Sequence, residues 1–189
     1  MKRLILASAS PRRMKLLKQI GLDFDVLPSS VPETWEENTS PLEIAQKLAR
    51  EKAEAIAGAL QSGVVIGADT LVVLGGRILG KPQNPDEAFR FLRKLSGRSH
   101  DVITAVVLLD AESGRALADE EVTRVFFREV SDQEIHAYIA SGEPMDKAGA
   151  YGIQGRGALF VKRIEGCYTN VVGLPLGKLG EMLTRILHE

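Results

Sequence analysis

A long apolar run, Val64–Leu74, constrains the fold of this 189-residue chain more than any other segment. It is rich in β-branched residues, which favour a buried strand, and Gly75-Gly76 after it is typical of a two-residue hairpin turn. Asp69 and Thr70 interrupt the run. Because an unpaired buried carboxylate is costly, Asp69 requires a cation, a set of hydrogen-bond donors or a metal. The structural alternative is a turn at residues 67–70 in which backbone N–H groups satisfy the carboxylate.

The rest of the chain alternates strand-like and helix-like segments, which predicts an α/β fold with a mixed sheet flanked by helices. Helices are expected after four N-cap residues, Ser10, Ser40, Asn84 and Ser131, and the second is expected to end near Gly58. A closing helix is expected at 174–187. The other expected strands are at 4–7, 24–27, 100–109, 122–130 and 159–164, with a loop at 28–39. Residues 1–189 are expected to form one domain of two lobes around a cleft.

Composition and charge narrow the class of protein. Hydrophobic residues make up 44% and charged residues 26% of the chain, as in soluble globular proteins. The net charge of −1 argues against binding to nucleic acid or to an anionic membrane, but allows an anionic small-molecule substrate. The single cysteine, Cys167, excludes an intrachain disulfide and fits a reducing compartment. No signal peptide or membrane span is predicted, so we expect a cytoplasmic protein.

The turn at residues 7–13 joins a strand to a helix N-terminus and has the sequence ASASPRR. Backbone N–H groups and the positive end of the helix dipole favour an anion there. Arg12 and Arg13 stand in the first helical turn, where the dipole disfavours cations, and a bound phosphate would offset that cost. The alternative, which remains open, is that both are solvated surface arginines.

Two lysines are further candidates for an anionic ligand. Lys52 shares a helical face with the apolar residues Ile44 and Leu48, although a lysine there can also extend to the rim. Lys81 lies between Gly80 and Pro82, and the proline restricts its backbone to extended conformations.

The glycine-rich stretch 149–157 contains Gln154, whose amide offers a donor beside an acceptor. A plain loop is the alternative. His100 is interpreted as a hydrogen-bonded core residue and is not assigned to catalysis.

Short motifs run in a fixed order through nearly the whole chain: residues 6–13, Glu33, residues 49–53, 67–70, 80–82, 95–97 with 100–106, 146–155 and 172–175. This ordered set resembles the Maf family of nucleotide pyrophosphatases. The resemblance implies a mixed α/β fold with an elongated sheet and a deep cleft, similar to inosine-triphosphate pyrophosphatases. It also implies that the chain cleaves a nucleoside triphosphate between the α- and β-phosphates.

Within the family, the chain is most similar to the branch that acts on dTTP and UTP, because Arg12, Thr70 and Gln154 match its specificity positions. Asp69 matches the general base. The resemblance implies a divalent cation, Mg²⁺ or Mn²⁺, with Glu33 and Asp69 as ligands, and a link to inhibition of septum formation. The remaining substrate-binding candidates from the sequence are Ser8, Arg13, Lys52 and Lys81.

Two other classes of function are weighed against this one. A nucleotide-binding regulator of septum formation would act through a protein partner and would bind without turnover. A phosphoesterase with an aspartyl-phosphate intermediate would require a second carboxylate two residues after Asp69, where Leu71 stands. The sequence leaves open whether the chain forms a homodimer.

Overall fold

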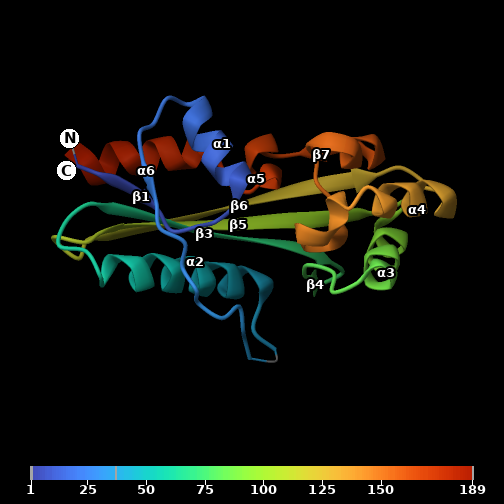
Figure 1. Ribbon diagram of the computed structural model, residues 1–189, viewed down its shortest axis with the longest axis horizontal. Helices are drawn as coiled ribbons and strands as arrows, with labels where there is room; N and C mark the ends of the chain where they lie inside the picture. Colours follow the sequence, from blue (N-terminus) through green and yellow to red (C-terminus); the bar gives the residue numbers. More distant parts are fainter. Residues whose placement is uncertain (1, 37, 189) are drawn as a thin grey trace. The chain divides into compact units, whose positions relative to one another are not determined.

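The computed structural model describes residues 2–36 and 38–188. Its seven-stranded sheet has the order β2-β1-β3-β5-β6-β7, and β4 pairs with β3 (Figure 1). The strand β1 pairs parallel with β2 and β3, whereas β3 with β4 and β6 with β7 are antiparallel. The sheet is therefore mixed, as predicted. The strands are β1 Leu4–Leu6, β2 Asp25–Val26, β3 Val64–Leu74, β4 Arg77–Leu79, β5 Ser99–Asp110, β6 Ala116–Phe127 and β7 Val161–Glu165.

Four helices begin where the sequence predicts them. Ser10, Ser40, Asn84 and Ser131 each accept a hydrogen bond from the backbone N–H three residues later, and Ser40 and Ser131 form complete capping boxes. The helices are α1 Pro11–Gln19, α2 Pro41–Ala57, α3 Pro85–Leu95, α4 Asp132–Ala140, α5 Tyr168–Val172 and α6 Leu176–His188. Three 3-10 helices lie between α4 and β7: η1 Glu143–Asp146, η2 Ala148–Ala150 and η3 Gly155–Phe160.

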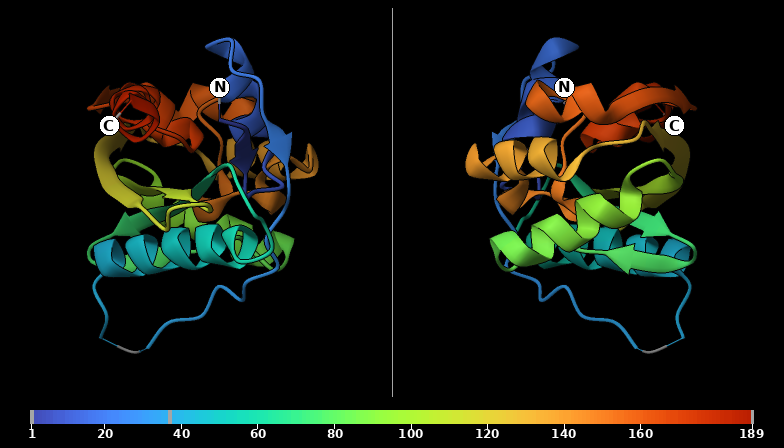
Figure 2. Two further views of the ribbon diagram at one scale, coloured as in Figure 1. Left: turned by 90° about the vertical axis from the view of Figure 1, so that its left-hand side faces the viewer. Right: turned by 90° about the vertical axis from the view of Figure 1, so that its right-hand side faces the viewer.

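The chain divides into two compact units. The first comprises Met1–Thr70, Thr104–Glu121 and Gly173–Glu189, and the second comprises Leu71–Ile103 and Val122–Val172. Within the first unit, α2 covers one face of the strands, and α1 and α6 cover the other (Figures 1 and 2). Within the second, α3 packs against α4, over a core that includes Leu92, Phe127 and Ile135. The predicted cleft between two lobes stays a prediction.

A close approach between α2 and β3 fixes the layer spacing of the first unit. A Cβ atom on Gly67 would lie 2.3 Å from the carbonyl oxygen of Ala49 and 2.8 Å from the Cβ atom of Ala53. Glycine therefore lets the helix lie directly on the strand. Because β3 continues unbroken through Asp69, the alternative turn at residues 67–70 is wrong.

Other expectations need correction. The strand predicted at 122–130 begins six residues earlier, at Ala116, because its first half carries charged, partly exposed side chains that hide the strand pattern. Arg13 takes a buried place on α1, whereas the apolar Ile20 after the last residue of this helix is 43% exposed. The short helix α5 was not predicted. The described part of the loop predicted at 28–39 contains no helix or strand, and residue 37 lies outside the described residues.

The structure confirms that His100 is a core residue. It is 3% exposed, and its Nε2 atom lies 2.7 Å from the hydroxyl oxygen of Tyr151. Its ring also contacts Phe127 edge-on. Burial lowers the pKa of His100 from its ordinary value of 6.5 to about 4.

This pKa predicts a pH dependence of stability. Between pH 6.5 and 4 the unfolded chain takes up a proton at residue 100 that the folded chain does not, so acidification through that window favours unfolding, by at most about 3 kcal/mol. Replacing His100 with Gln should remove this part of the slope of unfolding free energy against pH, measured by urea denaturation. The matched control is His136→Gln, because His136 is exposed. An unchanged slope in His100→Gln would contradict the prediction.

Candidate functional site

The turn between β1 and α1 is fixed by serine side chains. Ser10 caps α1 by accepting a hydrogen bond from the Arg13 N–H at 3.4 Å. The hydroxyl of Ser8 accepts one from the Ser10 N–H at 3.2 Å. These contacts hold the residues just before α1 and direct Arg13 inward from the first helical turn.

Arg13 is buried and makes three hydrogen bonds. Its Nε atom donates to the carbonyl oxygen of Gly173 at 2.8 Å, and its two terminal nitrogens donate to the hydroxyls of Ser8 at 3.1 Å and Thr70 at 3.0 Å. Burial lowers the pKa of the Arg13 guanidinium, and the charge of Asp69 opposes that shift. The interpretation of Arg13 as a solvated surface arginine is wrong. Arg12 beside it is half-buried.

Thr70 links this network to the middle of the sheet. Its hydroxyl lies 2.9 Å from that of the fully buried Thr104 on β5, and 3.4 Å from the carbonyl oxygen of Gly173. Sequence reasoning did not single out Thr104, because a threonine within a strand carries no distinctive pattern. Thr104 and Gly173 lie within the family motifs at residues 100–106 and 172–175, but the motifs alone assign neither residue a role.

Lys52 lies between two carboxylates. Its ammonium donates to Oδ1 of Asp69 at 2.6 Å and to Oε1 of Glu33 at 2.8 Å. The Lys52 side chain is 10% exposed and that of Asp69 7%, whereas the Glu33 side chain is 47% exposed. The Lys52 ammonium is thus the cation that the buried Asp69 requires.

The surroundings of Asp69 show whether the residues present fit the expected divalent cation. Oδ2 is buried and has no hydrogen-bond partner in the described part of the chain. Residues 2–36 and 38–188 contain no cluster of three or more side chains able to hold a metal ion. Mg²⁺ is often held by only one or two carboxylates together with substrate phosphates and water. Asp69 and Glu33 fit that pattern, because both carboxylates bond to the Lys52 ammonium and so lie close together.

The structure therefore brings six of the predicted residues into direct contact in two sets: Ser8, Arg13 and Thr70 form one, and Glu33, Lys52 and Asp69 form the other. Arg12 adjoins the first set. Lys81 and Gln154 belong to the second unit, and both are exposed. There the Gly149 N–H donates to the carbonyl oxygen of Gly80 at 3.0 Å, so the turn with Lys81 is joined to the segment with Gln154.

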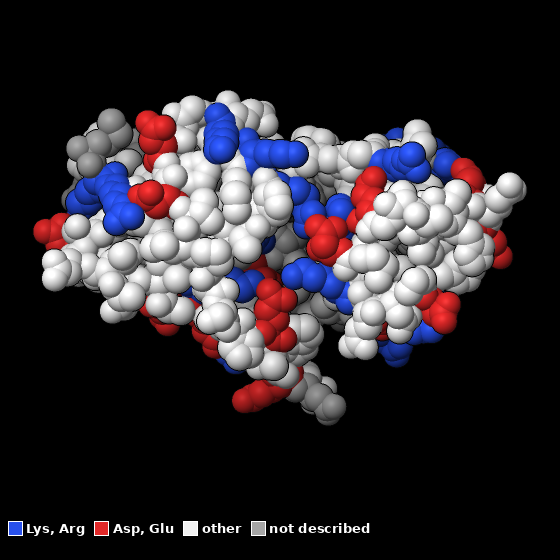
Figure 3. Space-filling view, in the orientation of Figure 1, with Lys and Arg blue, Asp and Glu red and all other residues white. Residues whose placement is uncertain are grey.

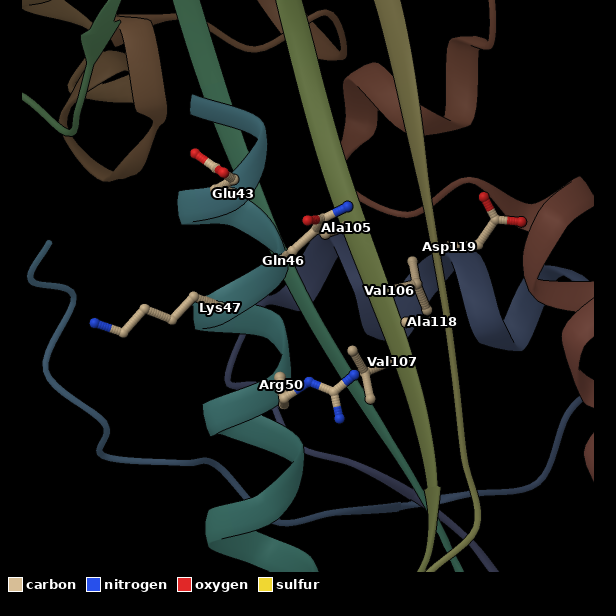
Figure 4. Close-up of a pocket in the computed structure, with 9 residues that line it drawn as sticks. All are labelled: Glu43, Gln46, Lys47, Arg50, Ala105, Val106, Val107, Ala118 and Asp119. Carbon is tan, nitrogen blue, oxygen red and sulfur yellow. The ribbon is translucent and has the colours of Figure 1, made fainter. Parts of the chain in front are cut away.

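Positive and negative side chains are interspersed over the face drawn in Figure 3, in keeping with the net charge of −1. A separate pocket in the first unit lies between α2 and the strands β5 and β6, where Arg50 extends beside Val107 (Figure 4). None of the predicted site residues lines it. No described helix is long and apolar enough to span a membrane.

Comparison with known proteins shows the family of the chain. The family model described as "Maf-like protein" matches residues 3–186. The chain belongs to the Maf family. Among solved structures, that of the Staphylococcus aureus Ham1 protein matches with a TM-score of 0.43 and 22% identity, over 67% of this chain and 72% of that one.

Several curated Maf relatives are similar over nearly their full length. A protein of Pelotomaculum thermopropionicum named dTTP/UTP pyrophosphatase is 52% identical, over 98% of this chain and 97% of its own. Proteins with the same name from Syntrophomonas wolfei and Alkaliphilus metalliredigens are each 51% identical. The Syntrophomonas match covers 95% of both chains. The Alkaliphilus match covers 100% of this chain and 98% of the relative.

The Arg13 network predicts that lysine cannot replace Arg13. An ammonium is a point charge that cannot reach Ser8, Thr70 and Gly173 at once, so Arg13→Lys should leave buried acceptors unpaired and lower the unfolding free energy by about 1–3 kcal/mol. Chemical denaturation measures the loss. Arg12→Lys, the same change at the half-buried neighbour, is the control and should cost less. Equal losses in the two variants would refute the special role of Arg13.

Proposed function

We propose that this Maf-family chain is a nucleoside triphosphate pyrophosphatase that hydrolyses dTTP and UTP to the nucleoside monophosphate and pyrophosphate. The observation that carries the proposal is the position of a buried aspartate, Asp69, one residue before Thr70. Asp69 pairs with Lys52, and Thr70 contacts Arg13 of the strand-to-helix turn. A carboxylate paired with a buried cation, next in the chain to a threonine that contacts the strand-to-helix turn, suits hydrolysis of a polyphosphate. The names of the curated relatives support the choice of substrate.

In the proposed reaction, Asp69 is the general base. The Asp69 carboxylate, whose Oδ2 atom has no hydrogen-bond partner in the described part of the chain, accepts a proton from a water molecule, whose oxygen attacks the α-phosphorus as pyrophosphate leaves. Lys52 holds the other oxygen of the carboxylate and so orients it. Positioning of this kind lowers the barrier because the reacting groups are already aligned.

Phosphate binding is assigned to cations and to the turn before α1. Arg12, Arg13, Lys52 and Lys81 offset the negative charge of the triphosphate, and Ser8 belongs to the turn that receives it. Arg13 uses three N–H groups on the protein, out of the five that a guanidinium carries, and its remaining N–H groups donate to phosphate oxygens. Lys52 is paired with two carboxylates, so its main role in this proposal is to hold Asp69.

Glu33 and Asp69 are the proposed ligands of Mg²⁺ or Mn²⁺. When bound, the ion would neutralise phosphate charge and polarise the attacked bond. Glu33 fits this role because its half-exposed carboxylate reaches the same ammonium as Asp69. The cytoplasmic location and the link to septum formation stay predictions from the sequence.

Base selection is assigned to Gln154, with Thr70 and Arg12 as the other specificity positions. The amide of Gln154 pairs with the N–H and carbonyl on one edge of uracil or thymine. The two bases differ by one methyl group, worth about 0.8 kcal/mol, so a site that reads this edge accepts both. Cytosine presents the reversed pattern of donors and acceptors, and pocket size excludes purines.

A substrate screen tests this assignment. Purified protein with Mg²⁺ should release pyrophosphate from dTTP and UTP with kcat/KM at least about tenfold above the values for CTP, ATP and GTP, since one mismatched hydrogen-bond pair costs about 1–3 kcal/mol. Omitting the metal should abolish release. Cleavage of GTP or ATP as fast as UTP would refute the assignment.

The base role of Asp69 predicts a selective loss of turnover. Asp69→Asn keeps the side-chain volume but removes the proton acceptor, so kcat should fall by about 10²–10⁴-fold while KM changes little. Steady-state kinetics with UTP measures both. Equal losses in kcat and in substrate affinity would count against a base. If the wild-type chain binds UTP without turnover, a nucleotide-binding regulator of septum formation is the better description.

A further inference from the structure

The segment that carries Gln154 is tied down on both sides of this residue. Gln154 is exposed and directly precedes η3. Its two flanks, at Gly152 and at Arg156-Gly157, bond to a pair of side chains from α4 and η1, and all of these residues belong to the second unit. The pair, Tyr138 and Glu143, has no part in the proposed reaction.

Glu143 holds the C-terminal flank. Its Oε2 atom accepts the Arg156 N–H at 3.1 Å, and its Oε1 atom accepts the Gly157 N–H at 3.3 Å. A carboxylate that accepts two successive backbone N–H groups fixes the start of η3.

Tyr138 holds the N-terminal flank. Its hydroxyl donates to Oε1 of Glu143 at 2.9 Å and accepts the Gly152 N–H at 3.2 Å. The tyrosine is 3% exposed, and its ring packs edge-on against Phe160 at a centroid distance of 5.0 Å. Burial raises the pKa of Tyr138, so the hydroxyl keeps the proton that it donates. One hydroxyl therefore joins both flanks of Gln154.

Glycines are required for the backbone to come this close. A Cβ atom on Gly157 would lie 2.3 Å from the carbonyl oxygen of Gly152 and 2.8 Å from the Tyr138 hydroxyl. A Cβ atom on Gly155, where φ is +78°, would lie 3.0 Å from both carboxylate oxygens of Glu143. The glycine-rich sequence thus serves a compact, hydrogen-bonded segment.

We propose that Tyr138 and Glu143 are positioning residues for base selection, which hold the backbone around Gln154 so that its amide meets the base in one orientation. The inference rests on the proposed function, in which Gln154 reads the pyrimidine edge. An amide that turns freely would pair with cytosine as well as with uracil, because rotation exchanges its donor and acceptor. A fixed backbone on both sides limits the positions that the amide can reach, and so supports discrimination.

The test compares Tyr138→Phe, alone and combined with Gln154→Ala, with the wild type. Phenylalanine keeps the ring that packs on Phe160 and removes only the hydroxyl. We expect KM for UTP to rise about tenfold, the size of one lost hydrogen bond, with kcat nearly unchanged. The preference for UTP over CTP should fall. In the Gln154→Ala background, Tyr138→Phe should change KM no further.

Two further variants support the comparison. Glu143→Gln replaces one of the two acceptor oxygens with an NH₂ group, which cannot accept the N–H of Arg156 or Gly157. This variant should therefore reproduce the rise in KM. Gln133→Ala, at an exposed position on the same helix, is the control and should leave the kinetics unchanged.

Hydrogen exchange separates this inference from the proposed function. In Tyr138→Phe the amide of Gly152 should exchange faster, whereas the amides of β6 should not. Unchanged exchange would overturn the inference, as would an equal rise in KM in the Gln154→Ala background. If the wild type shows no pyrimidine preference and Gln154→Ala does not alter its substrate profile, the proposed function fails instead, whatever the exchange result.

Discussion

The buried ion pair between Lys52 and Asp69 is the interaction on which the candidate site depends. Asp69 lies within an apolar strand, where a carboxylate without a partner would destabilise the fold by several kcal/mol. The ammonium lies 2.6 Å away because α2 rests directly on β3, and this contact is possible because residue 67 has no side chain. Gly67, two residues before Asp69, is therefore as necessary to the site as the lysine that pairs with the aspartate.

The strand also explains how two sets of polar residues arise from one short motif. Successive side chains of a β-strand point to opposite faces of the sheet. Asp69 meets Lys52 from α2, and Thr70 meets Arg13 from α1, and these two helices cover opposite faces of the first unit (Figure 1). Asp69 and Thr70, adjacent in the chain, thus each bind a cationic side chain, one on either side of β3. The hydroxyl of Thr104 on the neighbouring strand β5 bonds to that of Thr70.

Much of this arrangement can be predicted from the sequence. The capping residues gave the start of four helices, and the need of Asp69 for a partner followed from its apolar surroundings. The identity of the partner did not follow, because many cations along the chain are compatible with a buried carboxylate, and only the packing of α2 on Gly67 selects Lys52. Burial of Arg13 was not predicted either, since its acceptors include a carbonyl oxygen 160 residues away.

The fold holds the buried residues of the candidate site in a different way from Gln154. Lys52, Asp69 and Arg13 are buried side chains on regular elements, fixed by charge and by packing. Gln154 is exposed, and the backbone around it is fixed by Tyr138 and Glu143 instead. Because the Tyr138–Glu143 pair shares no side chain with the Lys52–Asp69 pair, a change in the segment around Gln154 can leave the buried ion pair intact.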